Sequence, residues 1–115
     1  MRTERATHER TAPMYFTGFA DEAGKDIDTQ IRATKELGWT SIEARNIEGR
    51  NIHDLDDVTF DTVCEKLASA GLSVNCFGST IANWGKQITD PFETSLAEAR
   101  RAIPRVKRLG TKLIR

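Results

Sequence analysis

Two charged side chains near the middle of the chain, Glu43 and Arg45, have the types and the spacing that chemistry in an enclosed site requires. They alternate with Ile42 and Ala44 within residues 40–45. Because successive side chains of a β-strand point to opposite faces, this alternation predicts a strand with one apolar face and one face that carries an acid beside a base. On a solvent-facing sheet such a pair means little. Inside a closed barrel the two charges have left water, which costs several kcal/mol per ion unless they are paired or used.

The composition of the 115-residue chain limits the function classes. It contains 17 basic and 17 acidic side chains, so the net charge is zero, which argues against a dedicated nucleic-acid binder. No run approaches the roughly 18 apolar residues that indicate a membrane-spanning helix. Cys64 and Cys76 do not form a spaced metal motif, and we expect them to be buried free thiols in a protein of the reducing cytoplasm.

The first 13 residues (MRTERATHERTAP) are polar and without period, and they lack the apolar segment of a secretory signal. We expect a disordered tail over residues 1–13 and a folded domain over residues 14–115. Met14 stands directly before the first apolar run, and we expect it to be the natural start of the protein.

Four strands and three helices are predicted in strict alternation. The strands cover residues 15–20, 40–45, 72–77 and 111–115, and the helices cover about 27–37, 58–70 and 91–109. Each helix ends at a glycine (Gly38, Gly71 or Gly110) that a strand follows at once. Alternating units with short helix-to-strand turns imply a parallel sheet with right-handed crossovers.

The helix boundaries carry their own signals. Asp26 is placed to cap the first helix, and Asp90 is placed to cap the last, with Pro91 at the first helical position and Glu93 completing a capping-box arrangement. Pro104 is expected to kink or split that last helix, because proline lacks the amide hydrogen and clashes with the preceding turn.

Two architectures use this order of elements. An open doubly wound sheet buries both faces, so its central strands are continuous apolar runs, whereas a (β/α)8 barrel can hold polar residues inside. The second and third predicted strands each have one polar face, with Glu43 and Arg45 on one and Ser73 and Asn75 on the other. A barrel takes about 250 residues. We therefore predict an α/β fold, the N-terminal half of a TIM barrel, with the first three βα units and the start of the fourth strand.

Four stretches resemble the sugar phosphate isomerase/epimerase family, which has the xylose-isomerase-like TIM barrel. They are residues 20–24 (ADEAG), 41–51 (SIEARNIEGRN), 75–79 (NCFGS) and 108–115 (RLGTKLIR). The resemblance implies a metal-dependent enzyme that moves a proton between adjacent carbons of a sugar or polyol. In that family the divalent ion is usually held by acids and a histidine from later strands. The resemblance therefore implies a divalent metal ion in the full-length enzyme, no metal ligand in this segment, and no activity of the segment alone.

Several residues match the family's pocket, and two interpretations stay open for each. Glu43 and Arg45 either line the sugar pocket or form a mutual ion pair that closes the barrel floor. Asp21 and Glu22, at the carboxyl end of the first predicted strand, either face the substrate or cap their loop. The implied partner is a small-molecule sugar or polyol; assembly with a second copy also stays open.

The two longer loops are less informative. Ser79 and Trp84 lie in the loop after the third predicted strand, where a tryptophan can stack on a sugar ring or pack over the barrel mouth. His53 lies in the loop of residues 46–57 and faces no clear carboxylate, so a ligand role is the minority interpretation. The basic residues late in the last helix are expected to form a solvated face: Arg100, Arg101, Arg105, Lys107 and Arg108.

Two other functions compete with the isomerase. One is an apurinic-site endonuclease built on a related metal-containing barrel, against which the zero net charge speaks. The other is a non-enzymatic signalling module of the flavodoxin-like class. Asp21 and Glu22 could mimic its acidic pocket, but the third predicted strand ends without a phosphoacceptor aspartate.

Overall fold

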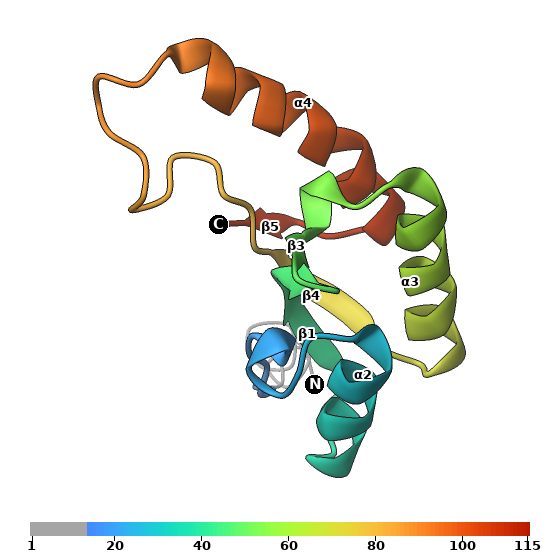
Figure 1. The fold of residues 1–115 in the computed structure, drawn as a ribbon. Coiled ribbons are helices and arrows are strands. Elements are labelled where there is room, and N and C mark those ends of the chain that lie inside the picture. Colours follow the sequence, from blue (N-terminus) through green and yellow to red (C-terminus); the bar gives the residue numbers. More distant parts are fainter. Residues whose placement is uncertain (1–13) are drawn as a thin grey trace, which may run out of the picture.

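A three-stranded parallel sheet forms the centre of the molecule, a computed structural model that describes residues 14–115. Its strands lie in the order β1 (Ser41–Ala44), β4 (Ser73–Phe77) and β5 (Leu113–Ile114). Three helices, α2 (Ile27–Glu36), α3 (Asp57–Ser69) and α4 (Phe92–Leu109), follow one another in an arc along one side of this sheet (Figure 1). The predicted parallel α/β fold is confirmed, whereas the predicted tail of residues 1–13 lies outside the described residues.

The first strand, predicted over residues 15–20, does not form, so this prediction is wrong. Only Phe19 makes a bridge to β1, opposite Glu43, and the Glu43 amide donates to the carbonyl oxygen of Gly18 at 2.9 Å. The chain then winds into a 3₁₀ turn, η1 (Ala20–Glu22). The segment pairs on one side only among the described residues, and a strand ladder needs more paired groups than this. It still lies beside β1, so the four segments follow one another in space as they do in the sequence.

A bulge interrupts the pairing of β1 with β4. Glu43 pairs with Cys76 rather than with Asn75, so Asn75 is the extra residue. Beyond the bulge, Phe77 is fully buried opposite Ala44 in the core under the helices. The predicted alternation over residues 72–77 therefore fails at Asn75, because one inserted residue moves every following side chain to the other face.

The three helix ends follow one pattern, as predicted. Gly38, Gly71 and Gly110 adopt positive φ angles of 76°, 73° and 68°. After each glycine, the next amide donates to a carbonyl oxygen five residues back, at 2.9–3.1 Å. This is the Schellman arrangement, and its left-handed position suits glycine because glycine has no Cβ to clash.

The helix starts agree with the sequence in part. Asp26 and Asp56 each accept a hydrogen bond from the amide three residues further on, at 2.8 and 2.7 Å, so the predicted cap at Asp26 is confirmed. The predicted cap at Asp90 is wrong, because α4 begins one residue later, after Pro91. The Asp90 carboxylate accepts from the Gln87 amide instead, which tightens the preceding loop.

The last helix, α4, runs unbroken past Pro104, so the predicted split is wrong. Tertiary contacts hold it on either side of the proline. Ala102 is fully buried in the core, and Arg105 donates to the carbonyl oxygen of Ile52 at 2.8 Å. Within residues 14–115, no helix combines the length and the apolar character that crossing a membrane requires.

The loop predicted over residues 46–57 contains ordered structure. Two short antiparallel strands, β2 (Asn46–Ile47) and β3 (Arg50–Asn51), form a hairpin. Its two turn residues, Glu48 and Gly49, both have positive φ angles, of 56° and 79°, as a type I′ turn requires. A 3₁₀ turn, η2 (Ile52–Asp54), then leads into α3.

Candidate functional site

The face of the sheet opposite the helices carries polar and aromatic side chains. We call it the open face and define it by Thr17, Phe19, Glu43, Arg45, Asn75, Cys76 and Arg115. Its members come from all four parallel segments, and side-chain contacts join them, such as the hydrogen bond of 2.7 Å from the Thr17 hydroxyl to the Asn75 side chain. The carboxyl ends of parallel strands meet at one edge of a sheet, so the charges of the open face gather there.

Arg45 is held by Asp21 in a bidentate ion pair. Its Nε and Nη2 atoms donate to the two carboxylate oxygens of Asp21 at 2.8 and 2.7 Å, and Nη2 also lies 3.4 Å from a carboxylate oxygen of Glu22. The guanidinium lowers the pKa of Asp21, although partial burial works against this. Asp21 also accepts from the Asn46 amide at 3.1 Å. Asp21 therefore caps a loop and orients Arg45. Arg45 pairs with Asp21 rather than forming the mutual ion pair with Glu43.

The space around this ion pair is a polar cleft of about 410 Å³. Asp21, Arg45 and Asn46 line one part of it, and Lys25 and Gly49 line the rest. The hairpin formed by β2 and β3 supplies Asn46 and Gly49, which is why the sequence, read as a plain loop, did not indicate this wall.

The Phe19 ring contacts two guanidinium groups. The Cζ atom of Arg45 is 4.0 Å from the centre of the Phe19 ring, and that of Arg115 is 5.0 Å from it. The Arg115 backbone is fixed by its amide, which donates to the Phe77 carbonyl at 2.9 Å. Sequence reasoning missed both Phe19 and Arg115. The available signal was that Arg115 ends the fourth predicted strand as Arg45 ends the second.

Glu43 remains an acceptor on the open face, because Arg45 is engaged by Asp21. The Glu43 carboxylate faces the thiol of Cys76 across the bulge. Burial raises the pKa of Cys76, and the negative charge of Glu43 raises it further. Cys76 is therefore a neutral thiol at physiological pH, and it is buried as predicted, whereas Cys64 is only half-buried.

Two predicted site residues do not reach the open face. Ser79 is buried, and its hydroxyl donates to the backbone carbonyl of Arg115, so it positions the last strand. Trp84 is 95% exposed on the long loop between β4 and α4, which projects from the body of the molecule (Figure 1). Trp84 therefore does not pack on the described residues, and both its packing over a barrel mouth and its stacking on a sugar ring stay predictions.

His53 also differs from the expectation that it faces no carboxylate. Its side chain is fully buried, with Nδ1 3.0 Å from a carboxylate oxygen of Asp54 and Nε2 2.8 Å from the Thr80 hydroxyl. Three of the helical arginines are likewise paired rather than simply solvated: Arg101 with Asp54, Arg105 with Asp57, and Arg108 with Asp61. These contacts join elements far apart in the sequence, and helical spacing alone does not contain them.

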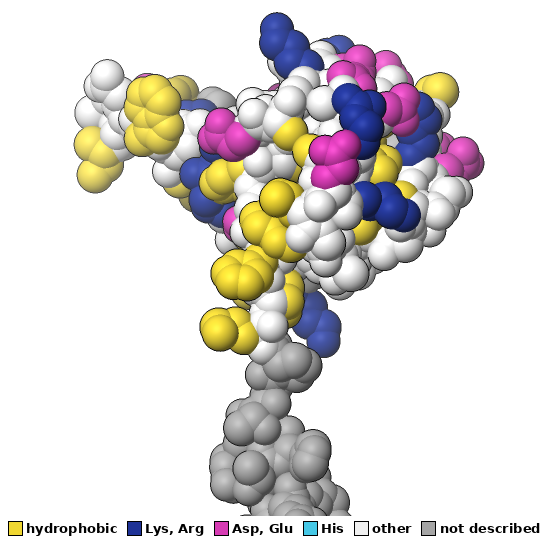
Figure 2. Space-filling view, turned by 90° about the horizontal axis from the view of Figure 1, so that it is seen from below, with side chains coloured by type: hydrophobic (Ala, Val, Ile, Leu, Met, Phe, Trp, Pro, Cys, Tyr) yellow, Lys and Arg dark blue, Asp and Glu magenta, His cyan; other side chains and the backbone are white. Residues whose placement is uncertain are grey.

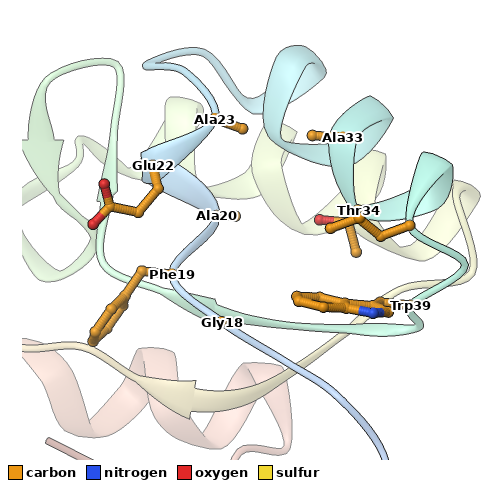
Figure 3. A pocket seen from close by; sticks show the side chains of 9 residues that line it. Gly18, Phe19, Ala20, Glu22, Ala23, Ala33, Thr34 and Trp39 are labelled. Atoms are coloured by element: carbon orange, nitrogen blue, oxygen red, sulfur yellow. The ribbon is translucent and has the colours of Figure 1, made fainter.

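A second cleft, also of about 410 Å³, lies on the helix side between η1 and α2. Its walls are mostly apolar, and Figure 3 shows the Trp39 indole forming one side below Ala20 and Thr34. Trp39 stacks on the exposed Phe16, with ring centres 6.1 Å apart. Hydrophobic side chains gather beside the point where the described residues begin (Figure 2). This cleft lacks the polar groups that a polyol needs.

The described residues do not build a metal centre. Within residues 14–115, no three side chains of histidine, cysteine, aspartate or glutamate converge as ligands of an ion do.

The open face can bind a ligand rich in hydroxyl groups. Glu43 offers carboxylate oxygens as acceptors, and Arg45 and Arg115 offer guanidinium donors for hydroxyl, carboxylate or phosphate oxygens. The Asp21 pair fixes Arg45 in advance, so little side-chain entropy remains to be lost on binding. Comparison of the chain with models of protein families, with curated proteins and with solved structures found no match.

Proposed function

We propose that this chain is the N-terminal half of a sugar (phosphate) isomerase/epimerase barrel, which moves a proton between adjacent carbons of a sugar or polyol. One observation supports this most strongly. Four parallel segments succeed one another in sequence order, with helices on one side and with Glu43, Arg45 and Arg115 near the carboxyl ends on the other. In barrels of this class the active site lies at that end of the strands.

Within this proposal the open face binds the substrate and does not transfer the proton. Glu43 accepts hydrogen bonds from substrate hydroxyls, and Arg45, held by Asp21, donates to an oxygen at one end of the polyol. The divalent ion would polarise the substrate's carbonyl or hydroxyl oxygens when bound. Its ligands would come from residues beyond those described here.

The strand order also weighs against the flavodoxin-like alternative. That fold places its first strand between the second and the third, in the order 2-1-3-4-5. Here the segment around Phe19 bridges to β1 at the outside of the sheet, and β1 alone separates it from β4. For the endonuclease alternative, the zero net charge remains the opposing observation.

The test uses the product of the whole reading frame that contains this chain. In heavy water with Mn²⁺, we expect deuterium to enter a ketose or its phosphate at the carbon next to the carbonyl, as mass spectrometry detects. Glu43→Gln should lower this exchange roughly tenfold or more, because a hydrogen bond to a charged group is lost. Glu48→Gln, on the exposed hairpin turn, is the matched control.

Two outcomes would overturn the proposal. One is a reading frame without acids and a histidine at later strand ends. The other is the absence of exchange across aldoses, ketoses, inositols and their phosphates.

A further inference from the structure

A chain of hydrogen bonds outside the open face joins three separate elements through one buried histidine. In η2, the carboxylate of Asp54 contacts His53 Nδ1 at 3.0 Å. His53 Nε2 contacts the Thr80 hydroxyl, in the loop between β4 and α4, at 2.8 Å. Thr80 in turn donates to a carboxylate oxygen of Glu98, in α4, at 2.6 Å.

The hydroxyl of Thr80 has a single hydrogen, which it donates in the hydrogen bond to Glu98. Burial alone would raise the pKa of Glu98, but hydrogen bonds from Thr80 and from the Lys86 ammonium outweigh this and lower it. Glu98 is therefore a carboxylate, which only accepts. Because the hydrogen of the Thr80 hydroxyl points to Glu98, the hydroxyl oxygen can only accept a hydrogen bond from the imidazole. This contact therefore requires a hydrogen on His53 Nε2.

The other ring nitrogen also faces an acceptor. The Asp54 oxygen next to Nδ1 already accepts from the Arg101 guanidinium, at 2.9–3.1 Å. A carboxylate oxygen has no proton to offer, so Nδ1 must carry a hydrogen as well. All these contacts are satisfied together only when each ring nitrogen carries a hydrogen, which makes the imidazole a cation, and its side chain is fully buried.

We infer that His53 is an internal proton switch, which in its cationic form fastens the loop between β4 and α4 to η2 and α4. Each neutral form breaks one contact. With a hydrogen on Nδ1 only, Thr80 must turn its proton from Glu98 to His53. With a hydrogen on Nε2 only, a lone pair of Nδ1 faces the Asp54 carboxylate. The fastening therefore requires the cationic form and weakens when His53 loses a proton.

The charges that surround His53 are balanced in sign, three acidic and three basic. Those facing it come from η2, α3, the loop and α4, namely Asp54, Asp57, Lys86, Glu98, Arg101 and Arg105. The switch also adjoins the open face, because Thr80 follows Ser79, whose hydroxyl holds the Arg115 carbonyl. The inference stands on these contacts and does not depend on the proposed reaction.

Nuclear magnetic resonance of the protein tests the protonation directly. His8→Gln leaves His53 as the only histidine, so its two ring ¹⁵N shifts can be followed against pH. We expect both nitrogens to be protonated at the acid end and one proton to leave as pH rises. A neutral imidazole with one fixed tautomer from pH 5 upward would overturn the inference.

Amide hydrogen exchange in the same samples tests the fastening. The amides of Asn83 and Lys86 close turns in this loop. At a pH where His53 is neutral, we expect these amides to exchange roughly tenfold faster than intrinsic base catalysis alone accounts for, because one hydrogen bond to a charged group is lost. Thr80→Val should abolish this extra step, and Thr80→Ser should retain it. Thr62→Val, which removes an exposed helical hydroxyl, should also retain it.

Two results would contradict the switch. One is loop exchange that follows intrinsic catalysis alone while His53 titrates. The other is a Thr80→Val protein that keeps the extra step. If Thr80→Val fails to fold, the titration of the protein with native Thr80 still decides between the two readings of His53.

Discussion

Arg45 and Asp21 face each other through two parallel hydrogen bonds, with only 9% of the Asp21 side chain exposed. Lysine cannot reproduce this planar pair of donors. We expect Arg45→Lys to lower the free energy of unfolding by roughly 1–3 kcal/mol, the cost of a poorly satisfied, nearly buried carboxylate. Urea unfolding measures this. Arg50→Lys, at an exposed position of the hairpin, is the control, and equal losses for both variants would refute the role given to Asp21.

The same pair predicts a dependence of stability on acid pH. The pKa of Asp21 is lowered in the folded chain, chiefly by Arg45. A lowered pKa means that the stabilisation is present above the unfolded value of roughly 3.9 and is lost as pH falls through the folded value. Asp21→Asn should therefore be less stable than the native chain at pH 7, and the difference should shrink as pH falls through the folded pKa of Asp21. Parallel stability curves over this fall in pH would contradict this.

Glu43 should control the reactivity of Cys76. Burial and the Glu43 charge both raise the pKa of the Cys76 thiol. Glu43→Gln removes the charge, so the thiolate fraction at pH 8 should rise, and with it the rate of alkylation by iodoacetamide. The measurement uses a Cys64→Ser background and mass spectrometry of the intact chain. Glu65→Gln, on α3, is the control, and an unchanged rate in Glu43→Gln would show that the two side chains do not interact.

Gln30 should be important for stability although it lies outside the site. Its side chain is fully buried, and the two hydrogens of its amide nitrogen are shared among three backbone carbonyls, those of Gly24, Lys25 and Asn46, at 3.0–3.2 Å. Gln30→Leu leaves these carbonyls without this donor and should cost roughly 2–3 kcal/mol in thermal or urea unfolding. Gln30→Glu replaces the donor with acceptors and should cost more. A Gln30→Leu protein as stable as the native chain would mean that water reaches these carbonyls.

The parts of the fold that depend on neighbouring residues could be predicted from the sequence. Gly38, Gly71 and Gly110 mark helix ends because the left-handed backbone there has a local cause, and the cap at Asp26 is equally local. The bulge at Asn75 could not be predicted, because it exists only in the pairing of two strands.

For the candidate site, strand alternation correctly placed Glu43 on the face opposite the buried Ile42 and Ala44. It did not identify the partner of Arg45, since Asp21 lies 24 residues away and is brought near by η1. His53 shows the same limit, because Thr80 and Glu98, which complete its hydrogen-bond chain, lie on other elements.

The succession of segments in the sheet has a consequence for synthesis on the ribosome. Each strand of the parallel sheet lies beside the parallel strand made just before it, with one α-helix between the two in the chain. No strand of the parallel sheet therefore waits for a partner more than one strand–helix unit away in the chain. Each strand–helix unit can dock onto its finished predecessor as it leaves the exit tunnel, so the chain can fold in the order in which it is translated.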